Sequence, residues 1–111
     1  MKGRGGGMQG GMANLMRQAN QMQLKIKKAQ EELAEREYEG TSGGGAVTVR
    51  VKGESQIISL QIKEDVMKTG DVEMLQDLIL TAANDALKTA RETQASEMEK
   101  ITGKFNIPGL F

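Results

Sequence analysis

The feature that most constrains the fold of this chain is a row of apolar residues at helical spacing near its start. The intervals alternate between three and four residues over about three heptads, which is typical of a helix that packs along a partner helix. We call these residues the apolar row: Met12, Leu15, Ala19, Met22, Ile26, Ala29 and Leu33. A helix over residues 12–35 would extend for about 36 Å. The sequence therefore predicts a long helical arm, for which Asn14 is a candidate N-cap.

The charges on this predicted arm are segregated, although the whole chain has fifteen basic and fifteen acidic residues and a formal net charge of zero. The first 29 residues contain six cations and no acid, whereas residues 31–39 contain five Glu and one Arg. Four of the cations lie on the helix away from the apolar row, and we call them the arm cations: Arg17, Lys25, Lys27 and Lys28. Such a face can follow the phosphates of a nucleic acid. The plainer alternative is a solvated face in which Lys27 and Lys28 pair with the glutamates four residues later.

The two-residue alternation of half-buried strands follows the arm. Apolar residues occupy every second position in residues 47–51 and again in residues 58–62, which predicts a hairpin of two strands. The segment around residues 36–41 is expected to add a third strand. Three consecutive glycines at residues 43–45 fit a turn better than a phosphate-binding loop, because no Lys-Ser or Lys-Thr pair follows them. The sequence thus predicts a three-stranded antiparallel sheet over residues 36–63.

A second long helix is predicted over residues 71–103. Asp71 is a candidate N-cap, and the acidic residues near it suit the positive end of the helix dipole. The apolar stripe of this helix is wider than contact with one sheet requires, so we expect one side to pack on the sheet and the other on a second subunit. The residues assigned to this dimer interface are Leu75, Leu78, Ile79, Ala82, Ala83 and Ala86.

The predicted elements follow the order α-β-β-β-α, which defines an α+β fold. Six of the fourteen glycines fall in residues 1–11, which predicts a flexible tail before the fold begins. The predicted organisation is a tail (1–11), a single domain (12–104) made of an arm (12–35), a sheet (36–63) and a helix (71–103), and a C-terminal apolar tail (105–111). A chain of 111 residues with two long polar helices buries little of its surface, so self-association is expected.

The residue types that the chain lacks exclude most enzyme chemistry. It contains no Cys and no His, and so it lacks thiolate nucleophiles, the usual proton carriers at neutral pH and the ligands of most zinc sites. We therefore expect no catalysis, no metal, no cofactor and no small-molecule substrate. No apolar run approaches the roughly 20 residues of a membrane span. The start of the chain also lacks the apolar core of a secretory signal, so we expect a cytoplasmic protein.

Three segments of the chain resemble the YbaB/EbfC family of bacterial nucleoid-associated proteins. The Gly/Met-rich start leads into a Met/Gln/Lys-rich helix over residues 14–33. The segment EGTSGGGAVTV (residues 39–49), together with Gly53, is similar to the family pattern EGxSGGGxVxVxxxG. The segment EMLQDLILTAANDAL (residues 73–87), and the closing IPGLF (residues 107–111), resemble the second helix and the end of the family's sequences. The resemblance extends over nearly the whole chain, in order.

The resemblance implies a tweezer-like homodimer, in which the sheets and central helices form the body and the first helices project as arms. It also implies binding of double-stranded DNA with little or modest sequence specificity, location in the nucleoid, and roles in nucleoid organisation and gene expression. The DNA-binding surface of the family is associated with the terminal helices, whose cations here are Arg17, Lys25, Lys27, Lys28, Lys88, Arg91, Lys100 and Lys104. The alternative function is a dimeric adaptor that holds a partner protein through the apolar row and the methionines, without binding DNA.

Overall fold

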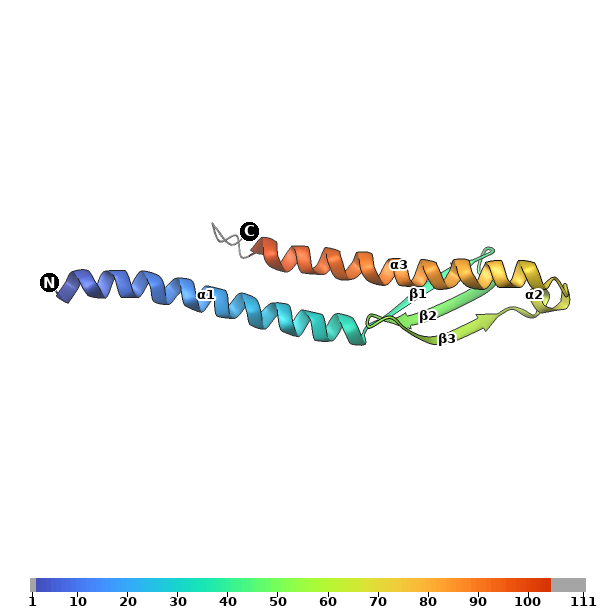
Figure 1. The fold of residues 1–111 in the computed structure, drawn as a ribbon, viewed down its shortest axis with the longest axis horizontal. Helices are drawn as coiled ribbons and strands as arrows, with labels where there is room; N and C mark the ends of the chain where they lie inside the picture. The colour runs from blue at the N-terminus through green and yellow to red at the C-terminus, as the bar shows by residue number, and fades with distance from the viewer. Residues whose placement is uncertain (1, 105–111) are drawn as a thin grey trace.

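Two long helices and a small sheet give the molecule an elongated shape (Figure 1). The computed structural model describes the backbone of residues 2–104 and the side chains of residues 11–103. The elements are α1 (Lys2–Glu35), β1 (Glu37–Ser42), β2 (Val47–Lys52), β3 (Gln56–Ile62), α2 (Glu64–Lys68) and α3 (Val72–Lys104). The radius of gyration is 22.8 Å, whereas a compact domain of about 100 residues has a radius of about 13 Å. The predicted α-β-β-β-α order is confirmed, with the short α2 added before α3.

The sheet is antiparallel, with the strand order β1-β2-β3. Every second residue of β2 is buried, which is the alternation that the sequence predicts. The glycines at residues 43–45 form the turn between β1 and β2 with φ between 59° and 95°, a conformation that glycine adopts without steric cost. The β2–β3 register shifts at a bulge, so that Ile57, and not Ile58, lies opposite Val51. This shift places Ile57 on the same face of the sheet as the β2 valines.

The core lies between α3 and the half of the sheet formed by β1 and β2. The three valines of β2 are almost completely buried, and Ala82 and Ala86 of α3 are buried against them. Gly40 of β1 makes this close approach possible, because a Cβ atom there would overlap the backbone of both alanines. The Ser42 Oγ donates a hydrogen bond to the Leu78 carbonyl oxygen at 2.6 Å. Small residues on both elements therefore fix α3 directly over β1.

Helix α3 begins at the N-cap that the sequence predicts. The Asp71 carboxylate accepts a hydrogen bond from the Met74 backbone N–H at 3.0 Å, which satisfies one of the free donors of the first helical turn. From there the helix runs for 33 residues to Lys104. Only its first half lies on the sheet, and its second half continues alongside α1 (Figure 1).

The C-terminal half of α1 packs antiparallel to the second half of α3 (Figure 1). Two hydrogen bonds close the junction between α1, the sheet and α3. The Tyr38 hydroxyl donates to the Leu33 carbonyl oxygen at 3.2 Å, and the Gln94 Nε2 donates to the Gly53 carbonyl oxygen at 2.9 Å. Burial of the phenol is the main reason why the pKa of Tyr38 is raised above its ordinary value of 10.0.

Helix α1 begins at Lys2, well before the start that the sequence predicts at Met12. The backbone of residues 2–11, where the sequence predicts a flexible tail, is helical, and Asn14 lies inside the helix and not at its N-cap. Each glycine disfavours a helix by about 1 kcal/mol. Glycine nevertheless keeps the backbone N–H that a helix needs, and a nucleated helix extends without a second nucleation cost. The predicted apolar tail, residues 105–111, lies outside the described residues.

Candidate nucleic-acid interface

The packing of α1 on α3 turns the arm cations towards solvent. From Ala19 to Leu33 the apolar row is half-buried or buried, because it faces α3. All four arm cations are exposed: Arg17, Lys25, Lys27 and Lys28. At about 100° and 1.5 Å per residue, Arg17 and Lys28 lie on nearly the same line, about 16.5 Å apart, on the side of α1 opposite the apolar row. The helix thus presents a cationic outer line over roughly three turns.

The outer part of the arm is not neutralised by its own acids. No Asp or Glu precedes Glu31 in the sequence. Among the side chains that the structure describes, neither Lys27 nor Lys28 forms the ion pair with Glu31 or Glu32 that the solvated-face alternative requires. The arm therefore carries a positive local potential, although the chain as a whole is neutral.

The acidic stretch at the base of the arm is partly engaged by cations of β2. Lys52 Nζ lies 3.5 Å from Glu35 Oε2, and Arg50 Nε lies 3.5 Å from Glu39 Oε1. These exposed pairs are worth little in stability. Arg50 and Lys52 offset part of the acidic charge next to the sheet. The change from positive to negative surface therefore falls near the base of α1.

The cations of α3 form a weaker candidate site than those of α1. The predicted α3 cations whose side chains are described are all exposed: Lys88, Arg91 and Lys100. Two of them already have acidic neighbours on the same helix, with Lys88 3.9 Å from Glu92 and Lys100 3.7 Å from Glu97. Lys104 lies at the end of α3, and its side chain is outside the described part. Because acids alternate with cations along α3, its local potential is lower than that of α1.

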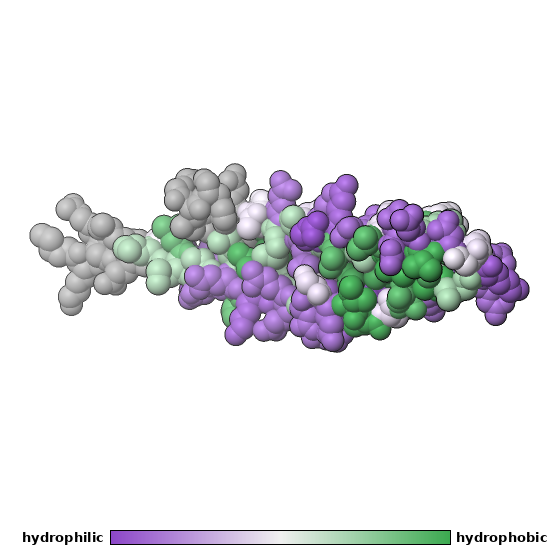
Figure 2. Space-filling view, turned by 45° about the vertical axis from the view of Figure 1, so that its right-hand side comes forward, coloured by the Kyte–Doolittle hydropathy of each residue, from purple (hydrophilic) through white to green (hydrophobic). Residues whose placement is uncertain are grey.

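The body of the molecule has an exposed apolar face on the side of β3. Helix α3 packs over β1 and β2 and leaves β3 uncovered. Ile57 and Leu60 share a face with the buried valines of β2, yet they are 56% and 47% exposed. Leu80 on α3 is 61% exposed. Figure 2 shows hydrophobic residues gathered over this sheet-bearing half of the molecule. We call Ile57, Leu60 and Leu80 the open apolar face.

The six residues that the sequence assigns to a dimer interface fall into two groups. Ala82 and Ala86 are completely buried within the chain, so they have no surface left for a partner. The other four are half-buried on α3: Leu75, Leu78, Ile79 and Ala83. Leu78 packs against the chain's own core, and a Cβ atom added at Gly43 would meet its side chain. The exposure of β3 was not predicted, because the apolar alternation of a strand does not reveal which strand α3 leaves open.

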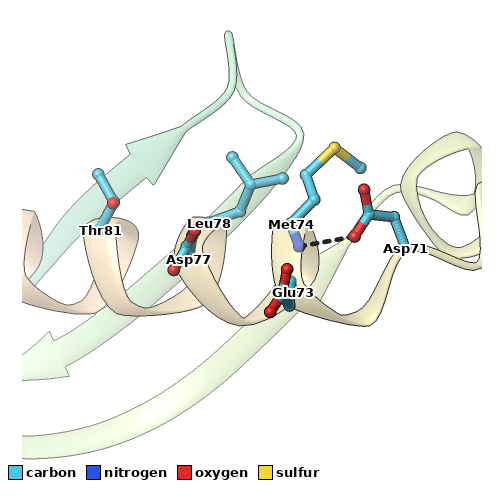
Figure 3. Close-up of a pocket in the computed structure, with 6 residues that line it drawn as sticks. All are labelled: Asp71, Glu73, Met74, Asp77, Leu78 and Thr81. Carbon is cyan, nitrogen blue, oxygen red and sulfur yellow. Dashed lines mark hydrogen bonds between the residues drawn. The ribbon is translucent and has the colours of Figure 1, made fainter.

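A shallow depression of about 370 Å³ lies beside the start of α3 (Figure 3). Its lining consists of Asp71, Glu73, Met74, Asp77, Leu78 and Thr81. The Asp71 carboxylate is engaged as the N-cap (Figure 3), and the negative charge of the lining repels phosphate. Within the described residues, no group of acidic side chains has an arrangement that could hold a metal ion. No helix among residues 2–104 has the length and apolarity to cross a membrane.

A long helix whose outer part carries cations and no acid before Glu31, attached to a small α+β body with an open apolar face, defines an elongated protein with a basic arm. A model of the YbaB/EbfC DNA-binding family matches residues 8–105, and the chain belongs to this family. The matched residues include α1 from its second turn onward, the whole sheet and all of α3. The family is one of DNA-binding proteins and not of enzymes.

Similar proteins come from several bacteria. A nucleoid-associated protein of Clostridium novyi (strain NT) is 55% identical over 112 residues, covering 97% of this chain and 98% of that protein. A nucleoid-associated protein of Caldanaerobacter subterraneus subsp. tengcongensis is 53% identical over 108 residues, covering 96% of this chain and 97% of that protein. The crystal structure of an uncharacterized protein from Helicobacter pylori has a TM-score of 0.63 at 24% identity, covering 79% of this chain and 92% of that chain. At this identity the structural likeness supports the fold alone.

Proposed function

We propose that this protein is a nucleoid-associated DNA-binding protein that binds duplex DNA as a homodimer, with little sequence preference. The observation that carries the proposal is the arm of α1, which exposes four cations and has no acid before Glu31, in a chain of a DNA-binding family. Binding in the nucleoid would give the protein a role in organising the chromosome and in gene expression. The family favours this function over an adaptor that does not bind DNA.

The chemistry of the arm suits contact with the phosphate backbone. Lys and Arg side chains that neutralise phosphates release condensed counterions, and this contribution does not depend on the base sequence. Arg17 and Lys28, about 16.5 Å apart on the outer line of α1, can reach phosphates separated along one strand. Lys25 and Lys27 lie on either side of that line, so they can contact phosphates as the duplex curves past the helix.

A homodimer would double this limited number of cations. The open apolar face offers the surface for it, because large apolar side chains of β3 and of α3 are exposed. Exposed apolar surface of this kind marks interaction sites in soluble proteins. A second copy that buries Ile57, Leu60 and Leu80 would complete the cover of the sheet. It would also bring two arms to one duplex.

A titration of the unmodified protein against labelled duplexes tests the function. We expect binding at about 50 mM salt, a steep loss of affinity as salt rises, and similar affinities for two unrelated sequences of equal length. The absence of binding at low salt would refute the proposal. An affinity indifferent to salt would refute the phosphate mechanism. Light scattering in the same buffer tests the dimer, since a mass of one chain at micromolar concentration would exclude the two-armed arrangement.

A further inference from the structure

The apolar row of α1 continues past the point where α3 ends. Among the described side chains, Ala19 is the first from the N-terminal side that is not exposed. Met12 and Leu15, which precede it in the same row, are 65% and 55% exposed. Figure 1 shows the reason, since α1 extends well beyond the C-terminal end of α3. Two turns of a helix stripe that is suited to packing therefore lie outside the α1–α3 contact.

The sequence that follows α3 has the composition to cover this stripe. Seven residues come after Lys104, with the sequence FNIPGLF, of which four are large and apolar and none is charged. Pro108 has no backbone N–H and disfavours a continued helix. Seven extended residues span at most about 25 Å, whereas Met12 and Ala19 are separated by about 10.5 Å along α1. A segment that starts beside α1 is thus long enough to lie along the stripe.

We propose that residues 105–111 dock in cis on the stripe of α1 formed by Met12, Leu15 and Ala19. The docked segment would extend the α1–α3 contact by about two turns and hold the outer arm in line with the body. The proposal does not depend on DNA, because every residue in this contact is uncharged.

The charge of the arm favours this occupant over a second copy of α1. Residues 1–30 contain six cations and no acid, so two arms packed along this stripe would bring together two segments of net positive charge with no acid to offset them. Like-charge juxtaposition of this kind opposes association. The segment FNIPGLF brings apolar surface to the stripe without adding charge, and it is already tethered beside α1 through α3.

Disulfide trapping tests the contact directly, since the chain has no native Cys. The test variant carries Leu15→Cys with Ile107→Cys, and the matched control carries Ala13→Cys with Ile107→Cys. Ala13 is exposed and is two residues from Leu15, but it lies about 160° around the helix. We expect the intramolecular disulfide to form at least about tenfold faster in the test variant, which corresponds to a preference of about 1.4 kcal/mol.

Each outcome of the trapping experiment decides the proposal. A faster product with the mass of one chain supports docking in cis. Equal rates in the two variants would mean that the segment samples both faces of α1, and would overturn the proposal. A faster product with the mass of two chains would assign the stripe to the C-terminal segment of a second copy, and would overturn docking in cis.

A second measurement does not depend on the cysteine variants. Removing residues 105–111 should accelerate amide hydrogen exchange in residues 12–19 by at least about tenfold, while exchange in residues 24–33, which α3 covers, stays unchanged. Unchanged exchange in residues 12–19 would contradict the docking. Neither experiment contains DNA, so a negative result here leaves the proposed DNA binding intact.

Discussion

Removal of the two cations on the outer line of α1 provides the sharpest test of how the arm meets DNA. The variant carries Arg17→Gln and Lys28→Gln. Both side chains are exposed and lie away from α3, so their loss should leave the packing unchanged. Gln is a good helix former, which means that α1 itself should be retained. Circular dichroism of the variant checks that the helix content is preserved.

The size of the effect follows from the number of contacts. Each phosphate contact contributes about 0.9 to the negative slope of log K against log salt for duplex DNA. A dimer loses four cations in this variant, so the slope should become less steep by about 3.6 if all four contact phosphate. Fluorescence anisotropy of a labelled duplex, measured at a series of salt concentrations, gives both slopes.

Lys68→Gln is the control for this measurement. Lys68 is also exposed, but it lies in α2, at the end of the molecule opposite the tip of the arm (Figure 1). Its replacement makes the same type of charge change and should leave the slope unchanged. A slope that stays as steep in the arm variant as in the unmodified protein would refute phosphate contact by Arg17 and Lys28. An equal change of slope in the control variant would mean that the effect arises from the net charge of the protein and not from contacts of these two residues.

Three further predictions concern stability and assembly. Gly40→Ala would drive a Cβ atom into the backbone of Ala86, and urea unfolding should show a loss of about 3 kcal/mol. Gly11→Ala, in α1 with open space around it, should stabilise the helix by up to about 1 kcal/mol. If Gly11→Ala destabilised the protein more than Gly40→Ala, the close packing of α3 on β1 would be contradicted. The pKa of Tyr38 is raised above 10.0 in the folded state. The contribution of the neutral phenol to the free energy of unfolding is therefore complete below a pH of 10.0, and it is lost as the pH rises through the pKa of the folded protein. Tyr38→Phe should abolish this loss of stability at alkaline pH. Because the chain has one Tyr and no Trp, tyrosinate absorbance follows this group alone, and an ordinary pKa would refute its burial. Leu60→Lys in the open apolar face should convert the proposed dimer to a monomer in light scattering, and an unchanged mass would exclude that face.

The sequence predicts the elements well where each one depends on local pattern. The alternation in residues 47–51 identifies β2, and the carboxylate of Asp71 identifies the start of α3, because a strand pleat and an N-cap are properties of a few neighbouring residues. The apolar row likewise identifies the contact of α1 with another helix. It does not reveal that this helix is α3 of the same chain, since spacing carries no information on the partner.

The start of α1 and the open apolar face could not be predicted for related reasons. Counting the glycines of residues 2–11 treats each as a helix breaker, whereas the outcome depends on the helix that already exists behind them. Ala82 and Ala86 have the same apolar character as their neighbours on α3, and only the close approach at Gly40 buries them completely. Which strand remains uncovered depends on that approach. The exposure of β3 therefore has its cause in β1.

The pairing of α1 with the second half of α3 joins the first and the last helices of the described chain. On the ribosome, the apolar row of α1 emerges before the sheet, and the half of α3 that covers it emerges after the sheet. At roughly 5–20 residues per second, the interval between Leu33 and Lys104 lasts on the order of 4 to 14 s. Throughout that time Met22 and Ile26 are open to chaperones and to other nascent chains. The arm is thus synthesised before the sheet and α3, yet it is among the last parts of the described fold to reach its final packing.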